Sequence, residues 1–317
     1  MKNKPLAVID IGTNTFRLLI AEVHKRKNYF IKEIHSERII TRLGEGVTKN
    51  RLIKKEAMKR GITALKKFNM LISQHRAQKV SAVATSALRK ARNSSEFIKR
   101  IQETTGLKVK IISGRDEAKK TFSGMLAGIT PPGTGLMVDI GGGSTELIFS
   151  IKDKPVLFHS LNLGVVYLAD KYMKHDPPQE KDLREMVFEI SKVIQSKSKP
   201  FTRLFSSDTV FIGTAGTITA LAAIIQGLNT YVHNKIHKSK ITIGEIQKIF
   251  SDFSSMTMKE RAKLLPFEPS RFDIIVPGTL ILLLLMKTFG LKKVMVSDYG
   301  LREGILLDLY RKIENKK

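Results

Sequence analysis

Short apolar stretches alternate with amphipathic ones along the chain, a pattern that predicts strands connected by helices. In the first half, strands are expected at 6–9, 16–23, 29–40, 80–84 and 108–112, and helices at 55–75, 94–106 and after residue 117. In the second half, strands are expected at 135–140, 145–151, 209–212 and 292–296, and helices at 182–196, 218–225 and 300–312. Strands that alternate with helices are typical of α/β folds.

Two further segments bear on the organisation of the chain. Residues 130–135 read Thr-Pro-Pro-Gly-Thr-Gly, a turn-forming composition that predicts a break between two lobes. The longest apolar run, Leu280 to Met286, is far shorter than the roughly 20 residues that span a bilayer, so it predicts a buried helix. No secretory signal opens the sequence, and we expect a soluble cytoplasmic protein without a membrane span.

The amino-acid composition excludes several kinds of functional site. The 317 residues include no cysteine, which excludes disulfide scaffolds, thiolate nucleophiles and cysteine zinc sites. The formal net charge is +26, and a field of that sign attracts nucleic acid, an anionic membrane or a polyphosphorylated small molecule. The basic residues are spread through every segment, which argues against a disordered nucleic-acid-binding arm.

An internal repeat points toward phosphate. The segment from Asp10 to Ile20 resembles that from Asp139 to Phe149: Asp-Ile-Gly recurs, and a hydroxyl recurs at Thr15 and Ser144. Glycines allow backbone N–H groups to converge on an anion, and an aspartate at a strand end can hold Mg²⁺. Two facing copies would clamp one phosphate group, whereas the simpler interpretation is a pair of hairpin turns.

A third glycine-rich turn, Gly213 to Thr217, lies between an expected strand and an expected helix. The N-terminus of a helix binds anions, so this turn could meet a further phosphate. A turn from strand to helix also needs glycine for conformational reasons, and the two interpretations stay open. Near the middle of the chain, Ser113 and Asp116 form a predicted capping box, so an acidic Glu117 in the first helical turn is explained by the helix dipole alone.

With these motifs in order, the sequence resembles the exopolyphosphatase/guanosine pentaphosphate phosphohydrolase (Ppx/GppA) family over essentially its whole length. The resemblance is carried by seven blocks, which lie at 7–18, 84–89, 112–118, 138–146, 213–217, 273–278 and 297–304. It implies two actin-like (ribonuclease H-like) α/β lobes of the actin, sugar kinase and Hsp70 superfamily, with the site in an interdomain cleft. The expected lobes are residues 1–122 and 123–299, with a C-terminal helix of about 300–317 packing back on the first lobe.

The sequence departs from the family pattern in three places. The usual Asp-Ile-Gly-Ser-Asn-Ser becomes Asp-Ile-Gly-Thr-Asn-Thr, which keeps both hydroxyls. Tyr167 stands where many members carry arginine, so a basic contact is missing there. Long members continue into a helical region that resembles HD phosphohydrolases, whereas this sequence has the short form and stops at Lys317.

The resemblance also assigns site residues. It implies that Glu117 is the general base and that Asp139 is catalytic as well. It implies Mg²⁺, with Mn²⁺ able to substitute, at Asp10, Asp139 and Glu146. The implied phosphate contacts are Asn14, Thr15, Arg17, Arg89, Gly141, Gly142, Gly143, Ser144, Gly213, Thr214 and Gly216.

The expected activity is Mg²⁺-dependent hydrolysis of the terminal phosphoanhydride of linear inorganic polyphosphate, which releases orthophosphate. The nearest alternative is a guanosine pentaphosphate phosphohydrolase, so the expected partners are polyphosphate or guanosine penta- or tetraphosphate; a homodimer is compatible with the family. Alternatives of other classes are a non-catalytic sensor of these anions, a kinase or ATPase of the superfamily, and a nucleic-acid binder, although no specific nucleic-acid motif is present. His233 and His237 are spaced i, i+4, but no zincin pattern follows, and a loop or exposed face is expected there.

Overall fold

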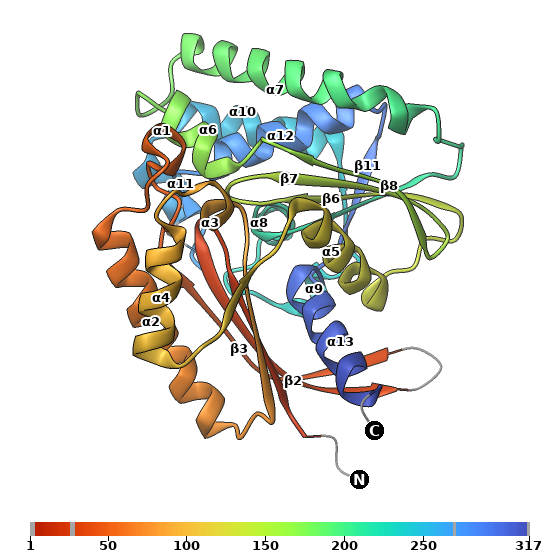
Figure 1. The fold of residues 1–317 in the computed structure, drawn as a ribbon. Coiled ribbons are helices and arrows are strands. Elements are labelled where there is room, and N and C mark those ends of the chain that lie inside the picture. The colour runs from red at the N-terminus through yellow and green to blue at the C-terminus, as the bar shows by residue number, and fades with distance from the viewer. Residues whose placement is uncertain (1–3, 26–28, 269–270, 316–317) are drawn as a thin grey trace. The chain divides into compact units, whose positions relative to one another are not determined.

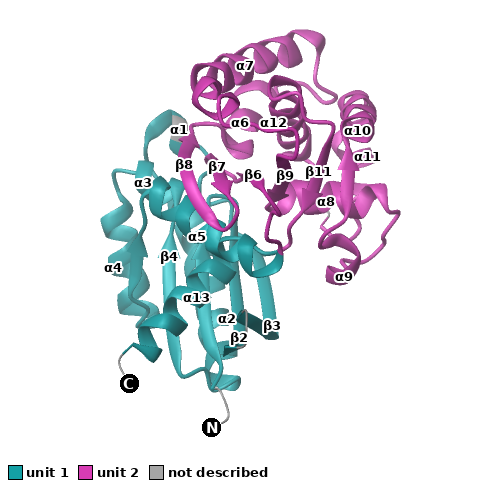
Figure 2. Ribbon diagram, turned by 90° about the vertical axis from the view of Figure 1, so that its right-hand side faces the viewer, with its two compact units in different colours: residues 1–128, 299–317 teal, residues 129–298 magenta. Residues whose placement is uncertain are grey.

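The computed structural model describes residues 4–25, 29–268 and 271–315 and divides into two compact units. Unit 1 comprises residues 1–128 and 299–317, and unit 2 comprises residues 129–298 (Figure 2). The first boundary follows residue 128, whereas the sequence placed it after residue 122, because helix α5 continues to Gly128 and belongs entirely to unit 1. Residues 299–317 return to unit 1, where α13 (Leu301–Glu314) packs on α5 (Gly114–Gly128).

Unit 1 is built on a five-stranded mixed sheet in the order β3-β2-β1-β4-β5, of which β2 and β3 are labelled in Figure 1. The strands are β1 (Leu6–Ile11), β2 (Thr15–Lys25), β3 (Tyr29–Ile40), β4 (Lys79–Ala84) and β5 (Val109–Ile111). The first three form antiparallel pairs, while β4 runs parallel to β1 and β5 runs parallel to β4. The central β1 is buried along its whole length, which is why it reads as a continuous apolar run.

Helices cover both faces of this sheet. The others in unit 1 are α1 (Val47–Asn50), α2 (Lys55–Gln74), α3 (Ser86–Lys90) and α4 (Ser94–Thr105). Along β1, Ala7 and Ile9 join one core with residues of α2 and α4, whereas Leu6 and Val8 join a second core with residues of α13. Because side chains alternate across a strand, Asp10 lies on the same face as Leu6 and Val8, the face that α13 covers.

Unit 2 repeats this topology with one added strand. Its sheet order is β10-β11-β9-β6-β7-β8. The strands are β6 (Thr134–Ile140), β7 (Thr145–Ile151), β8 (Lys154–Leu161), β9 (Val210–Thr214), β10 (Lys240–Thr242) and β11 (Lys293–Val296). The hairpins β6-β7-β8 correspond to β1-β2-β3, and the parallel strands β9 and β11 correspond to β4 and β5. The internal repeat in the sequence is therefore a repeat of fold, and the expected architecture of two α/β units with mixed sheets is confirmed.

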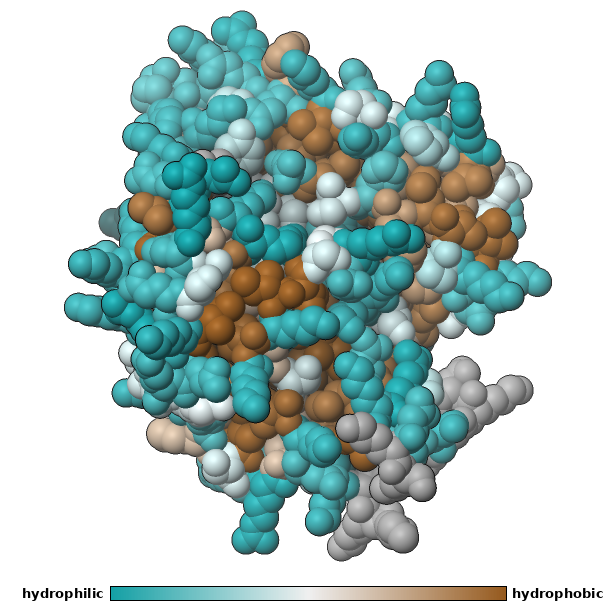
Figure 3. Space-filling view, viewed as in Figure 1, coloured by the Kyte–Doolittle hydropathy of each residue, from teal (hydrophilic) through white to brown (hydrophobic). Residues whose placement is uncertain are grey.

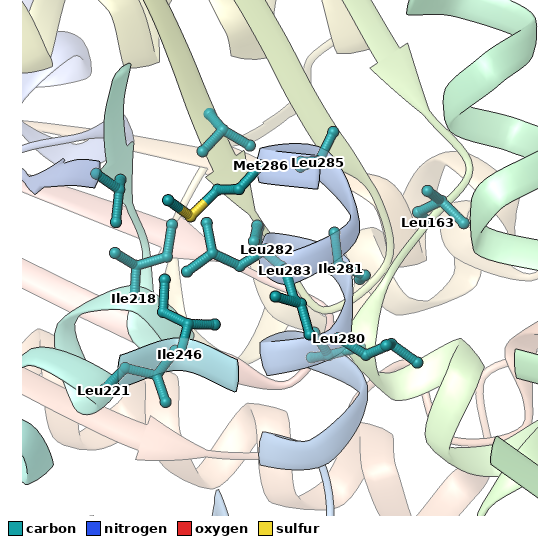
Figure 4. Packing of buried hydrophobic residues seen from close by; sticks show 14 of the residues in the cluster. Leu163, Ile218, Leu221, Ile246, Leu280, Ile281, Leu282, Leu283, Leu285 and Met286 are labelled. Carbon is teal, nitrogen blue, oxygen red and sulfur yellow. The ribbon is translucent and has the colours of Figure 1, made fainter. Parts of the chain in front are cut away.

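The core of unit 2 surrounds α12 (Ile275–Thr288), which contacts α6, α7, α8, α10 and β6. The remaining helices are α6 (Val165–Tyr172), α7 (Glu180–Thr202), α8 (Gly216–Ile225), α9 (His233–Ile236), α10 (Ile243–Ser255) and α11 (Met258–Lys263). Figure 4 shows the apolar run of α12 packed among Ile218, Leu221 and Ile246. The predicted buried helix at 280–286 is thus confirmed, and no helix within the described residues is long and apolar enough to cross a membrane.

The surface matches the composition. Figure 3 shows hydrophilic side chains over most of the visible face, interrupted by several brown apolar areas. The large apolar side chains that are most exposed, Met70 and Phe188, lie on α2 and α7 respectively.

Candidate functional site

In unit 1 the predicted site residues gather at one edge of the sheet. The parallel strands β1, β4 and β5 have their carboxyl ends at this edge, where ligands bind in open α/β sheets. The turn 12–15 follows β1, Arg89 lies on α3 just after β4, and Glu117 lies in the first turn of α5 just after β5. Topology thus brings together residues that are more than 100 positions apart in the sequence.

Arg89 and Glu117 form a direct ion pair. Nη1 of Arg89 lies 2.5 Å from Oε2 of Glu117 and also donates to the carbonyl of Ile112 at 3.0 Å. The Glu117 residue is only 7% exposed, so the guanidinium compensates a carboxylate that water barely reaches. One half of the predicted capping box is present beside it: the Ser113 hydroxyl accepts from the Asp116 N–H at 3.1 Å. The Asp116 carboxylate accepts from that hydroxyl, at 2.8 Å.

The turn between β1 and β2 is fixed by its carbonyl groups. The carbonyl of Thr13 accepts from the Gly44 N–H at 2.8 Å, and the carbonyl of Asn14 accepts from the backbone N–H groups of Thr41 and Arg42. Asn14 and Thr15 are buried, with Asn14 Nδ2 3.4 Å from Thr15 Oγ1. The loop after β3 therefore holds the turn in one conformation, as a preorganised binding turn requires.

The two hairpins of the repeat place different charges beside equivalent aspartates. In unit 1, Asp10 on β1 is paired in register with Arg17 on β2. In unit 2, Asp139 on β6 is paired in register with Glu146 on β7. Residues directly opposite each other on antiparallel strands have Cβ atoms about 5 Å apart on one face. The first pair therefore joins opposite charges, while the second brings two carboxylates together.

Two hydroxyl residues extend this pair of carboxylates across the unit 2 sheet. Thr214 on β9 is in register with Asp139, and Ser160 on β8 is in register with Glu146; we call these four residues the acidic row. The Ser160 hydroxyl donates to Oε1 of Glu146 at 2.7 Å, and both carboxylate residues are buried, at 9% and 1% exposure. No group of three His, Cys, Asp or Glu side chains that could hold a metal ion is present within residues 4–25, 29–268 and 271–315. Mg²⁺ bound through one or two carboxylates, waters and phosphate oxygens remains compatible with this row.

The glycine turn after β6 is anchored by the first turn of α6. The N–H groups of Val165 and Val166 donate to the carbonyls of Gly141 and Gly142 at 3.1 and 2.9 Å. In a trans peptide the carbonyl and the following N–H point in opposite directions, so the N–H groups of Gly142 and Gly143 point away from α6. Successive backbone amides of a turn are the donors of an anion-binding nest when they converge on one point.

Gly164 makes this anchoring possible. A Cβ atom at residue 164 would lie 2.3 Å from the Cα of Gly143 and 2.4 Å from the carbonyl oxygen of Gly142, closer than any side chain allows. Thr145, at the start of β7, donates its hydroxyl to the Leu163 carbonyl at 2.6 Å and ties the same segment to the sheet. This role of Gly164 has no local signal in the sequence, because the contact joins segments that are more than 20 residues apart.

The third turn carries backbone strain. Ala215 has φ 77° and ψ 171°, a combination that is essentially restricted to glycine. It precedes Gly216, the first residue of α8, where an added Cβ would lie 2.2 Å from the guanidinium of Arg271. Burial alone would lower the pKa of Arg271, but the Glu268 carboxylate, 2.7 Å away, raises it above its ordinary value. A charged guanidinium thus lies against the N-terminus of α8, a feature with no local signal in the sequence.

Similarity to known proteins identifies the family of this chain. A model described as the Ppx/GppA phosphatase family matches residues 19–313. This chain belongs to the Ppx/GppA phosphatase family. The expected family membership is confirmed, and with it the expectation of a phosphohydrolase.

Relatives of this family member align over nearly its whole length. Exopolyphosphatase 2 of Mycobacterium tuberculosis is 31% identical, over 96% of this chain and 98% of the relative. A bifunctional 3-dehydroquinate synthase/phosphatase of Fusobacterium nucleatum is 33% identical, over 98% of this chain but 47% of the relative. A crystal structure of the Aquifex aeolicus family member has 31% identity, a TM-score of 0.79 and 98% coverage of both chains. An exopolyphosphatase structure from Cytophaga hutchinsonii has 29% identity and a TM-score of 0.88 over 96% of this chain and 97% of that chain.

Two clusters give side chains partners that the sequence did not predict. His233 begins the short helix α9 with its side chain 43% exposed, and His237 lies in the turn that follows, as expected for a loop or an exposed face; their rings stack on each other. His233 Nδ1 lies 2.5 Å from Oδ2 of Asp298, whose other carboxylate oxygen accepts from the Tyr231 hydroxyl. Tyr167, the residue in place of arginine, hydrogen bonds instead to Glu189 on α7.

Proposed function

We propose that this family member hydrolyses the terminal phosphoanhydride bond of linear inorganic polyphosphate and releases orthophosphate. The Mycobacterium tuberculosis relative named exopolyphosphatase 2, which aligns over 96% of this chain, supports the substrate class. The net charge of +26 supports a long polyanion, because a basic surface raises the rate of capture at low ionic strength.

The observation that carries the proposal is the buried Glu117 carboxylate held by Arg89 at the carboxyl edge of the unit 1 sheet. In the proposed reaction Glu117 takes a proton from the water that attacks the terminal phosphorus. The Arg89 guanidinium places a positive charge beside the carboxylate that would accept this proton. Arg89 contacts Glu117 and Ile112 through Nη1, and its other guanidinium nitrogens carry donors suited to phosphate oxygens.

The proposed phosphate contacts lie in three turns, one in unit 1 and two in unit 2. Gly142 and Gly143 would supply amides and Ser144 a hydroxyl, while the Gly141 N–H donates to the Ser144 carbonyl at 2.9 Å and closes the turn. In unit 1, Asn14 and Thr15 would supply side-chain donors. The preorganised turn of unit 2 supports this assignment, because its carbonyls are held by α6 and its amides point the other way. Arg17, Gly213, Thr214 and Gly216 complete the proposed set. Strain at Ala215, between two of these residues, is of the kind that occurs at functional sites.

We also propose that Mg²⁺ supports the reaction and that Asp139 and Glu146 of unit 2 hold it. Asp10, which occupies the equivalent position in unit 1, stays a predicted metal ligand. The buried row of oxygen donors in unit 2 fits a hard cation that keeps several waters. When bound, such an ion neutralises the charge of the phosphate oxygens, which a purely acidic row would repel. Ser160 orients the Glu146 carboxylate through its hydrogen bond.

The test is orthophosphate release by the purified protein, with long-chain polyphosphate and guanosine pentaphosphate compared side by side, each with Mg²⁺ and with chelator. Glu117→Gln and Asp139→Asn should lose release while circular dichroism shows the fold intact. Glu103→Gln, on the exposed face of α4, is the matched control and should keep full activity. Full activity of Glu117→Gln would remove the proposed base.

The same experiment separates the alternatives. Faster release from guanosine pentaphosphate would reassign the substrate within the same chemistry. Tight binding of either anion without release would favour a sensor. If neither anion is hydrolysed or bound, turnover of ATP becomes the measurement that tests a kinase-like activity.

A further inference from the structure

We propose that Glu189, on α7, is a positioning residue for the glycine turn 141–144: its carboxylate holds α6, and α6 holds the turn. The inference rests on the proposed phosphate-binding function of that turn. It extends the site to a residue that lies in another layer of unit 2 and that contacts none of the proposed substrate-binding groups.

The Glu189 carboxylate gathers three donors, all from α6. The Tyr167 hydroxyl donates to Oε1 at 2.5 Å, and the Lys171 ammonium donates to Oε2 at 2.5 Å. The Tyr172 hydroxyl also donates to Oε2. Lys171 Nζ lies 3.0 Å from the Tyr167 hydroxyl as well, so the four side chains form one closed network. Hydrogen bonds to an ionised acceptor are the strong ones, and three of them fix α6 against α7.

The opposite end of α6 holds the turn. This helix has only eight residues, and its first two N–H groups, at Val165 and Val166, donate to Gly141 and Gly142. Tyr167 is the next residue, so the side-chain network begins one position after the last turn contact. Eight residues make only about two helical turns, so we treat α6 as one rigid piece. A shift of its side-chain network then moves the carbonyls of Gly141 and Gly142. The amides of Gly142 and Gly143, which point away from α6, move with them.

Glu189 is not needed to hold its own helix. α7 packs against α12 through the buried Met186, Ile190 and Ile194, on the apolar face of the helix. The Glu189 side chain is 21% exposed and lies beside that face rather than within it. Removal of its charge should therefore leave α7 in place and loosen α6 selectively. The effect should fall on the turn amides, which are proposed to bind phosphate equally in the ground state and in the transition state. Loss of such binding raises KM more than it lowers kcat.

The test compares Glu189→Gln with Glu180→Gln. Glu180 is on the same helix and pairs with Arg184 at 3.4 Å, but it is 82% exposed and has no described contact to α6. Three quantities are measured: hydrogen exchange of the Gly142 and Gly143 amides, the Kd for inorganic phosphate, and the KM and kcat for polyphosphate. For Glu189→Gln we expect faster amide exchange, an increase of about tenfold in Kd and KM, and kcat within about twofold of the wild type.

The outcomes separate this inference from the proposed function. If the wild type does not release orthophosphate, the proposed function fails, while hydrogen exchange still decides whether Glu189 holds the turn. Unchanged exchange in Glu189→Gln, or equal acceleration in Glu180→Gln, would overturn the positioning role. Tyr167→Phe, which removes one hydroxyl and keeps the ring, provides a second variant in case Glu189→Gln does not fold. It should show the same changes to a smaller extent.

Discussion

Nη1 of Arg89 lies 2.5 Å from Oε2 of Glu117, although the two residues are 28 positions apart in the sequence. The pair is possible because α3 and α5 follow the adjacent parallel strands β4 and β5, whose carboxyl ends share an edge. The guanidinium thus compensates a buried carboxylate. In the proposed reaction it also donates to a phosphate oxygen, so the substrate and the proposed base, Glu117, would both contact this one cation.

Arg89→Met should destabilise the protein by about 3 kcal/mol, because it leaves the buried Glu117 carboxylate without its cation. In a Glu117→Gln background the same substitution should cost less than about 1 kcal/mol, since no buried charge is left behind. Urea unfolding of the four proteins measures this coupling. Additive costs in the double variant would show that the ion pair does not stabilise the fold.

Gly164→Ala should displace the turn 141–144, because the new Cβ would lie 2.3 Å from the Cα of Gly143. We expect a loss of about 1–3 kcal/mol in stability and a raised KM for the substrate. Gly244→Ala is the matched control, since a Cβ at residue 244 meets nothing within 4 Å. Thermal unfolding and steady-state kinetics of both variants test this expectation. Equal stability and equal KM in the two variants would contradict it.

Ala215→Gly should stabilise the protein, in contrast to most substitutions to glycine. Its φ of 77° and ψ of 171° are costly for alanine, and relief of that strain should gain about 1 kcal/mol. Ala220→Gly, in the helical and buried interior of α8, should instead cost about 1 kcal/mol. Opposite shifts of Tm are therefore expected, and a loss of stability in both would show that Ala215 is not strained.

The pH dependence of stability should report the Glu189 network. Burial pushes the pKa of the Glu189 carboxyl upward, but hydrogen bonds from Lys171, Tyr167 and Tyr172 outweigh it and hold the pKa below its ordinary value. A lowered pKa means that this stabilisation is complete above the unfolded pKa of about 4.3 and is lost as pH falls through the folded value.

Glu189→Gln should therefore be less stable than the wild type at pH 7, and the gap should narrow below about pH 4.3. Unfolding free energies measured in urea at pH 7 and pH 3.5 test this expectation. A gap that stays constant between the two pH values would mean that the carboxylate charge does not hold α6.

The sequence predicted the repeated parts of the fold well, because their patterns are long and regular. Strand β3 has the predicted bounds, Tyr29–Ile40, and the two Asp-Ile-Gly hairpins share one topology. Short elements were missed: α3 has five residues and α9 has four, too few for a helical period to show. Strand β8 was also missed, since it begins Lys-Pro and lies at the sheet edge with an irregular burial pattern.

The site was predictable only where its residues are local. The hydrogen bond from the Asp116 N–H to the Ser113 hydroxyl depends on spacing within one turn and was predicted. The Arg89–Glu117 pair, the contact of Gly164 with Gly143, and Arg271 at the start of α8 depend on which strands are neighbours. Sheet order is set by packing over the whole chain, so these contacts appear only in the folded structure.

The return of residues 299–317 to unit 1 has a consequence for synthesis. Helix α13 packs so closely on α5 that a Cβ at Gly304 would lie 1.8 Å from the Lys120 carbonyl, and one at Gly124 would lie 1.9 Å from the Gly300 carbonyl. A nascent chain of 298 residues contains all of unit 2 but lacks this helix. On the ribosome, unit 2 can therefore fold while unit 1 waits, and the helix that carries Glu117 receives this packing partner only after all of unit 2 has been synthesised.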